Sequence, residues 1–276
     1  MIELWGNTMN KKGIKIVCIV MICIIACLAI YPFLYSYFCK HRVYTEISGK
    51  ISDEILSANI EIIKQTQREE SIGYSTGFGG VIFKHTGNKY YVLTAYHAVN
   101  PLNNSKFIAL AYNEPNYREY ISTKAKYIRI SGYYEQFPFA NVEYYDEKYD
   151  LAILSFKSDA NLNALDIADK PPQYGDKVVA ISSPYGEERN MITYGKVTSR
   201  SLIKFNDDTE DMGYKMIKHS AYINKGSSGS AVMNKNLEIV GINLGGATNI
   251  FGKYGYGMAM PSDKINDFIA QWNNSQ

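Results

Sequence analysis

The pattern of apolar and polar positions divides the chain into three main parts. Residues 16–39 carry no charged side chain and read IVCIVMICIIACLAIYPFLYSYFC, whereas residues 40–70 are largely polar. From residue 71 onward, short apolar runs alternate with turns that contain Gly, Pro, Asn or Asp, which is typical of β-strands. We therefore predict an N-terminal tail (1–15), a transmembrane helix (16–39), a partly helical juxtamembrane connector (40–70) and one folded domain (71–276).

The uncharged run is long enough to cross a bilayer. A helix over residues 16–39 would span about 36 Å at ~1.5 Å per residue, against a hydrocarbon core of roughly 30 Å. Three lysines lie within residues 11–15, just before the run, and this bias favours a cytoplasmic N-terminus and a single-pass protein whose body is extracytoplasmic. The lipid bilayer is then a partner of the run. A cleaved signal peptide and a lipoprotein signal ending at Cys27 remain alternatives.

The connector contains a second helical pattern. Ile51, Ile55, Ala58 and Ile62 follow the i, i+4, i+7 and i+11 spacing of one helix face. This spacing predicts an amphipathic helix over residues 51–66 that packs on the folded domain or mediates self-association with a sister chain.

The apolar runs of the folded domain have the length of strands. They are a hairpin at 81–95 with its turn at 86–88, followed by runs at 151–156, 177–182, 195–203, 231–234 and 237–244. Because no long helix separates these runs, they predict an all-β barrel or sandwich. A helical pattern begins only at Ser262, close to the C-terminus.

Composition and cysteine placement exclude several kinds of chemistry. Lys and Arg number 29 against 27 Asp and Glu, so no strong basic excess suggests nucleic acid as a partner. The four cysteines lie at positions 18, 23, 27 and 39. The folded domain therefore has no cysteine nucleophile, no internal disulfide and no Cys-ligated zinc site.

Three polar residues stand out beside the predicted strands. His97 ends an apolar run in TAYHAV, Asp150 opens one in YDLAIL, and Ser228 lies between glycines in NKGSSGSAV. A serine nucleophile needs an adjacent base, and the base needs a third group that orients it. The backbone amides of Gly226 and Ser228 could bind an oxyanion in the same loop. The alternatives to these assignments are Asp146 for the carboxylate and Ser227 or Ser230 for the nucleophile.

These stretches resemble the catalytic motifs of trypsin-like serine peptidases. TAYHAV is similar to their catalytic-His strand, YDLAIL to their catalytic-Asp stretch and NKGSSGSAV to their nucleophile loop. Residues 76–82, 238–243 and 255–262 resemble the first strand, the strand after the nucleophile and the closing strand of bacterial HtrA-like members. The resemblance covers about residues 71–270, in the family's order. It is closest to the HtrA-like and glutamyl-endopeptidase-like branch.

The resemblance implies two six-stranded antiparallel β-barrels with a chymotrypsin-like topology, a C-terminal helix and a Ser228–His97–Asp150 triad between the barrels. It implies a membrane-anchored serine endopeptidase that acts on proteins or peptides and needs no metal or organic cofactor. Only a helix follows Pro261, so we expect no PDZ module. A catalytically silent binding protein of the same fold and an esterase with the same triad are the alternative functions.

Two further features follow from the resemblance. The segment from 111 to 146 is longer and richer in tyrosine than a compact member needs, so we expect a surface insertion. By the same comparison, residues 222–225, 244–246 and 256–259 bound the S1 pocket, and its expected lining is Tyr222, Leu244, Gly245 and Gly246. Because none of these four residues carries a charge, we expect cleavage after small or medium uncharged residues.

Overall fold

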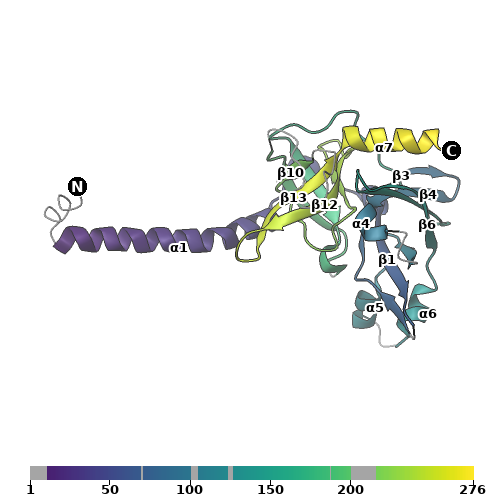
Figure 1. Ribbon diagram of the computed structural model, residues 1–276, viewed down its shortest axis with the longest axis horizontal. Helices are drawn as coiled ribbons and strands as arrows, with labels where there is room; N and C mark the ends of the chain where they lie inside the picture. The colour runs from purple at the N-terminus through teal and green to yellow at the C-terminus, as the bar shows by residue number, and fades with distance from the viewer. Residues whose placement is uncertain (1–10, 70, 101–104, 124–126, 187, 200–215) are drawn as a thin grey trace.

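The computed structural model consists of a long N-terminal helix and a body made of two β-sheets (Figure 1). It describes residues 11–69, 71–100, 105–123, 127–186, 188–199 and 216–276. Helix α1 (Lys11–His41) projects from the body, and helix α7 (Ser262–Asn274) packs on the body at the other end of the chain. The predicted C-terminal helix is confirmed, with Ile265 and Phe268 buried on its inner face.

The first sheet is a closed barrel with one additional edge strand. Its strands are β1 (Asn59–Gln67), β2 (Ile72–Tyr74), β3 (Phe78–Thr86), β4 (Lys89–Ala95), β5 (Ser105–Leu110), β6 (Phe139–Asp146) and β7 (Leu151–Lys157). The strand order is β2-β1-β3-β4-β7-β6-β5, and β1 also pairs with β5. This last pairing closes six strands into a barrel, which removes the open edges of the sheet.

The second sheet has six strands in the order β10-β13-β12-β11-β8-β9. They are β8 (Lys177–Ser182), β9 (Met191–Lys196), β10 (Ile217–His219), β11 (Ala231–Met233), β12 (Ile239–Thr248) and β13 (Tyr254–Pro261). A bridge between Val197 and His219 brings its two end strands together. The expected all-β, chymotrypsin-like architecture is thus confirmed. The predicted strand at 195–203 overlaps only the end of β9, and its residues 200–203 lie outside the described part of the chain.

The predicted helix over residues 51–66 is wrong. The structure has only a five-residue helix there, α3 (Asp53–Ser57), preceded by α2 (Thr45–Ser48), and strand β1 begins at Asn59. Ile60 and Ile62 are buried in the core of the first barrel, and Ile63 is buried on its other face. The isoleucines of this segment therefore serve the barrel itself, and the helix that was to mediate self-association does not exist.

The long segment between β5 and β6 forms a small layer on the outside of the first barrel. It contains α5 (Tyr117–Thr123) and α6 (Ile130–Tyr134), which lie on the side of the body away from α1 (Figure 1). Buried Tyr133 and Tyr134 pack with the barrel residues Ile63 and Ile108. The abundance of tyrosine in this segment thus gives the layer its own apolar core, with hydroxyl groups left for polar partners.

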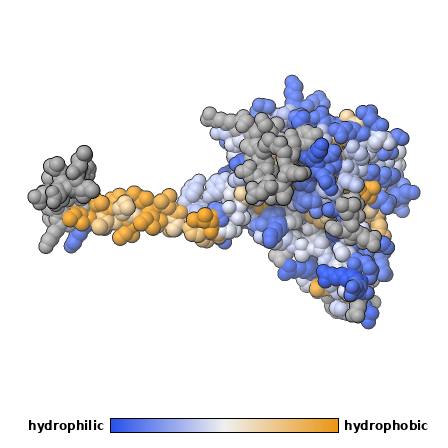
Figure 2. All heavy atoms as spheres, viewed as in Figure 1, coloured by the Kyte–Doolittle hydropathy of each residue, from blue (hydrophilic) through white to orange (hydrophobic). Residues whose placement is uncertain are grey.

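Helix α1 has an exposed apolar section and an end that packs on the second sheet. Segment 13–48 contains a window of mean hydropathy 2.9 with none of its residues buried, so it is long and apolar enough to cross a membrane. Figure 2 shows this section as a hydrophobic rod outside the body. At its end, Cys39 is fully buried, Lys40 pairs with Glu188 at 2.9 Å and Arg42 donates to Ser220 Oγ at 2.9 Å. The helix is therefore held at a defined place on the body.

Candidate active site

The side chains of His97, Asp150 and Ser228 form a continuous hydrogen-bonded chain where the two sheets meet. His97 lies in the short helix α4 (Tyr96–Val99), directly after β4, and Asp150 directly precedes β7. His97 Nδ1 is 2.7 Å from Asp150 Oδ2, and His97 Nε2 is 3.0 Å from Ser228 Oγ. Three residues far apart in the sequence, all expected from their motifs, are thus within hydrogen-bond distance of one another.

Strand pairing explains why Asp150 meets His97. Ala95 of β4 lies opposite Leu151 of β7, so the residues just beyond them are neighbours. Asp150 adopts φ +50°, a left-handed conformation that Asp and Asn tolerate better than other side chains. Its Oδ1 accepts the backbone N–H of His97 at 2.8 Å while Oδ2 faces Nδ1. The carboxylate therefore keeps the proton on Nδ1 and leaves Nε2 free to accept one.

Asp146, the alternative to Asp150 as the catalytic carboxylate, has a structural role in the turn before it. Asp146 Oδ1 accepts the backbone N–H groups of Lys148 at 2.7 Å and Tyr149 at 3.2 Å. These bonds stabilise the turn between β6 and β7, as Asp side chains commonly do. Asp146 thus shapes the turn that presents Asp150.

The loop before β11 places Ser228 at the first barrel. The carbonyl of Ser228 accepts the backbone N–H of Gly79 at 2.8 Å. Gly229 has φ +84°, and a Cβ at this position would lie 2.2 Å from the Gly79 carbonyl oxygen, so only glycine permits this approach. Ser227 and Ser230 are fully buried and bond to Ser182 Oγ and the Ser227 carbonyl, respectively. Of the three serines, only Ser228 reaches His97.

A buried polar network behind this loop was not predicted. The Asn243 carbonyl accepts the N–H of Gly229 at 2.7 Å, and Asn243 Nδ2 donates to Ser230 Oγ at 2.9 Å. Asn243 Oδ1 must then be the acceptor toward His219 Nε2, 2.8 Å away. Burial lowers the pKa of His219 to about 4, so the imidazole is neutral and donates from Nε2. No local motif marks His219, because its partner lies in another strand.

The candidate oxyanion site depends on the orientation of one peptide group. The Lys225 carbonyl accepts the N–H of Tyr185, in the turn Pro184–Gly186, at 2.6 Å. In a trans peptide the N–H points opposite to the C=O, so the Gly226 N–H points away from that turn. Within the described residues, neither the Gly226 amide nor the Ser228 amide donates a hydrogen bond. Both donors are thus available to a carbonyl oxygen of a bound peptide.

Gly226→Ala is expected to lower kcat about 10² to 10³-fold, the effect of losing one oxyanion donor. Gly226 has φ +93°, and a Cβ there would lie 2.7 Å from the Ser183 carbonyl oxygen, so the peptide group has to rotate. The matched control is Gly175→Ala, because Gly175 has φ +91° but open space around the added Cβ. It should lose stability and keep kcat. Equal kcat values for the two variants on one peptide substrate would contradict the assignment.

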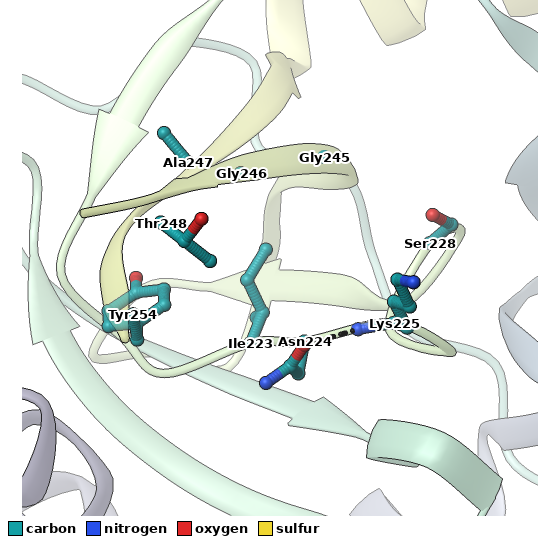
Figure 3. Close-up of a pocket in the computed structure, with 9 residues that line it drawn as sticks. All are labelled: Ile223, Asn224, Lys225, Ser228, Gly245, Gly246, Ala247, Thr248 and Tyr254. Carbon is teal, nitrogen blue, oxygen red and sulfur yellow. Dashed lines mark hydrogen bonds between the residues drawn. The ribbon is translucent and has the colours of Figure 1, made fainter. Parts of the chain in front are cut away.

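A cavity of about 270 Å³ opens beside Ser228 (Figure 3). Its lining consists of Ile223, Asn224, Lys225, Ser228, Gly245, Gly246, Ala247, Thr248 and Tyr254. Gly245 and Gly246 line it as expected, whereas Tyr222 and Leu244 do not. Leu244 is buried in the main core, and the Tyr222 ring packs at a tilt against Tyr254 with Lys40 of α1 over its face. Ile223 and Tyr254 are therefore the bulky side chains of this pocket.

A buried carboxylate connects the tyrosine-rich layer to the turn that supports the oxyanion loop. Glu61 is 2% exposed, and its Oε1 accepts from Asn116 Nδ2 at 3.4 Å. The same Nδ2 donates to the Gly186 carbonyl at 2.6 Å. Burial raises the pKa of Glu61 to about 8. Arg189, whose Nε lies 4.0 Å from Glu61 Oε2, stabilises the charged carboxylate, but this effect is smaller than the cost of removing the charge from water.

Glu61→Gln is expected to stabilise the protein at pH 8 more than at pH 5. A raised pKa means that the folded state binds the proton more tightly, so the associated stability is lost as pH rises from the unfolded pKa, about 4.3, toward 8. The difference in free energy of unfolding between Glu61→Gln and the parent should grow by about 1.4 kcal/mol per pH unit over that window. Thermal unfolding in a Ser228→Ala background, which prevents autolysis, measures it. The exposed control Glu54→Gln should show no such growth, and a pH-independent effect of Glu61→Gln would refute the raised pKa.

A closed antiparallel barrel and a six-stranded half-barrel, with a Ser–His–Asp chain at their junction, define the class of chymotrypsin-fold serine peptidases. The chain belongs to the trypsin-like peptidase domain family, whose model matches residues 78–242.

The comparisons with curated proteins point to the HtrA-like branch. The chain is 32% identical to periplasmic serine endoprotease DegP of Escherichia coli over 127 residues, which is 46% of this chain and 26% of DegP. It is 28% identical to serine protease Do-like HtrA of Lactococcus lactis over 72% of this chain and 46% of that protein. Serine protease HTRA1 of Xenopus laevis is 36% identical over 134 residues, 48% of this chain and 28% of that protein. The chain thus matches less than half the length of each relative.

Proposed function

We propose that the protein is a membrane-anchored serine endopeptidase that cleaves protein or peptide substrates through an acyl-enzyme. The observation that carries this proposal is the hydrogen-bonded path from Asp150 through His97 to Ser228. Membership in the trypsin-like family and the names of the curated relatives support the same activity.

In the acylation step, Ser228 Oγ attacks the carbonyl carbon of the scissile peptide bond. His97 Nε2 takes the Oγ proton, and Asp150 stabilises the imidazolium that forms. The carbonyl oxygen becomes an oxyanion, which the amides of Gly226 and Ser228 bind. When the intermediate collapses, the C–N bond breaks and His97 gives its proton to the leaving amine.

Deacylation uses the same groups in reverse. Water attacks the Ser228 ester, and His97 Nε2 takes one of its protons. The oxyanion forms again at the amides of Gly226 and Ser228. Its collapse breaks the ester bond, and His97 returns the proton to Ser228 Oγ.

The pocket beside Ser228 supports a preference for uncharged P1 residues. No residue that lines it carries a carboxylate, and a buried P1 cation without a partner would cost several kcal/mol. Lys225 is the one charged residue of the lining, and it is exposed to solvent, so it is a poor partner for a buried acidic P1 residue. Ile223 projects toward the segment of β12 that carries Gly246 and Thr248 (Figure 3), which limits the depth of the pocket. We expect Ala, Val, Leu or Thr at P1. A cleavage-site profile dominated by Arg, Lys or Glu would refute this preference.

We also propose that α1 anchors the protein in the cell membrane, with the N-terminus in the cytoplasm and the peptidase body outside. The exposed apolar section and the lysines before it support this orientation, and DegP is named as periplasmic. Protease added to spheroplasts should digest the body while a cytoplasmic marker stays intact. Protection of both until detergent is added would reverse the orientation.

A fluorophosphonate probe tests the catalytic proposal most directly, because it labels only an activated serine. The full-length protein in detergent should be labelled, and labelling should be lost in Ser228→Ala and retained in Ser227→Ala. Absence of labelling in the parent protein would favour a silent binding protein. Turnover of ester substrates without turnover of peptides would instead identify an esterase.

A further inference from the structure

The hairpin between β12 and β13 carries at its tip the most exposed large apolar side chain among the described residues. Ile250 is 93% exposed, and its neighbour Phe251 is 46% exposed. The tip is a defined turn: Asn249 Oδ1 accepts the backbone N–H groups of Phe251 at 2.9 Å and Lys253 at 3.1 Å. A single exposed apolar residue needs no explanation, but the position of this tip provides a second observation.

The tip lies against helix α1. The rings of Phe251 and Phe33 have centroids 5.9 Å apart, and Lys253 Nζ lies 5.2 Å from the centroid of the Phe33 ring. Figure 1 shows the loop between β12 and β13 beside the end of α1 that joins the body. Since the last turn of α1 is packed on the second sheet, the hairpin tip contacts the helix at a fixed position along its axis, beside Phe33.

That position corresponds to the boundary between hydrocarbon and headgroups. This step rests on the proposed anchoring by α1. About 20 helical residues cross a hydrocarbon core of roughly 30 Å, so a span that begins at Ile16 ends near Tyr35. Phe33 then lies in the last turn of the hydrocarbon-spanning part, and the hairpin tip beside it lies at the membrane interface.

We propose that the tip, Asn249–Lys253, is a second membrane contact, which inserts Ile250 and Phe251 into the interface of the outer leaflet next to α1. Aromatic and aliphatic side chains on a turn suit this region, where apolar atoms leave water while the backbone stays near polar headgroups. Lys253 Nζ lies over the Phe33 ring, and the flexible stem of a lysine at this position allows its ammonium to reach the lipid phosphates.

The hairpin that carries the tip also forms one wall of the pocket beside Ser228. The strands that end in the tip also form the pocket wall, through Gly245, Gly246, Thr248 and Tyr254. At ~3.3 Å per residue in a strand, Thr248 lies within about 7 Å of Ile250 along the chain. The proposed hairpin contact would therefore bring this wall of the pocket close to the bilayer surface.

Tryptophan fluorescence in brominated lipid tests the contact. The full-length chain carrying Trp5→Phe is reconstituted in phosphatidylcholine vesicles, with or without bromines on the acyl chains. In this background Trp272, which is 3% exposed on α7, gives the baseline. The added Ile250→Trp should emit at shorter wavelength than a water-exposed indole, and brominated lipid should quench its contribution at least about twofold.

The matched control is Ile121→Trp, an exposed position on α5 on the side of the body away from α1, which should not be quenched. Two results would overturn the proposal: a water-like, unquenched emission from Trp at 250, or a short-wavelength emission that bromine does not quench, which would indicate a second copy or another protein on the tip. Flotation of the vesicles is measured separately. Protein that does not float with lipid refutes the anchoring by α1, whereas floating protein without quenching refutes only the hairpin contact.

Discussion

Ser228→Ala is expected to reduce kcat on a peptide substrate by a factor on the order of 10⁶. Only Ser228 Oγ lies within hydrogen-bond distance of His97 Nε2 among the three serines of the loop. The backbone of the loop is held by bonds that do not use this hydroxyl, from Gly79 N–H to the Ser228 carbonyl and from Gly229 N–H to Asn243. Folding and substrate binding should therefore remain, as shown by an unchanged Tm and by retained binding of a product peptide.

Ser227→Ala is the matched control for this experiment. Ser227 is the adjacent residue and is fully buried, and its hydroxyl donates to Ser182 Oγ and accepts the backbone N–H of Asn224 at 3.2 Å. Its removal should cost about 1 to 3 kcal/mol of stability for each buried partner left without a hydrogen bond, with kcat close to that of the parent. The opposite outcome, an inactive Ser227→Ala and an active Ser228→Ala, would mean that the nucleophile is wrongly assigned.

Asp150→Asn is expected to reduce kcat about 10⁴-fold at neutral pH. Asn tolerates the left-handed φ of +50° at this position, so the backbone should stay as it is. Its carbonyl oxygen can still accept the backbone N–H of His97, and its NH₂ group then faces Nδ1. The imidazole has to place its proton on Nε2, where it can no longer accept the proton of Ser228.

The pH dependence and a second variant separate this effect from misfolding. As pH rises and hydroxide becomes available as a base, the activity of Asp150→Asn should recover more than that of Ser228→Ala. Asp146→Asn is the control, because Asp146 supports only the neighbouring turn, and it should keep most of the activity. Equal losses in Asp146→Asn and Asp150→Asn would assign the effect to the turn and not to the His97 tautomer.

The catalytic candidates could be proposed from the sequence because each lies in a short local motif next to a strand. The helix over 51–66 was mistaken because the spacing of its isoleucines fits a helix face, whereas the decision between helix and strand depends on pairing with β3 and β5. Such pairing joins residues distant in the sequence, and a local pattern does not contain it.

The residues that line the pocket were also hard to predict from the sequence, and the error is one position along the chain. Neighbouring side chains of an extended segment point to opposite sides. An error of one position therefore replaces a residue that lines the pocket with one that faces away from it. Tyr222 was expected in the pocket, yet Ile223 lines it while Tyr222 faces α1. Likewise, Leu244 points into the core and Gly245 borders the cavity. The buried His219–Asn243 pair joins two strands and has no signature in either.

The division of the candidate triad between two sheets affects what the chain can do while it is still being synthesised. His97 and Asp150 belong to the first barrel, and Ser228 lies 131 residues beyond His97, in the second. During synthesis the first barrel can fold with its base and carboxylate in place while no nucleophile yet exists. Under the proposed mechanism, the growing chain would be unable to cut itself or its neighbours until the second sheet has docked through the contact between Gly79 and Ser228. The order of the three residues along the chain thus delays assembly of the candidate triad until late in synthesis.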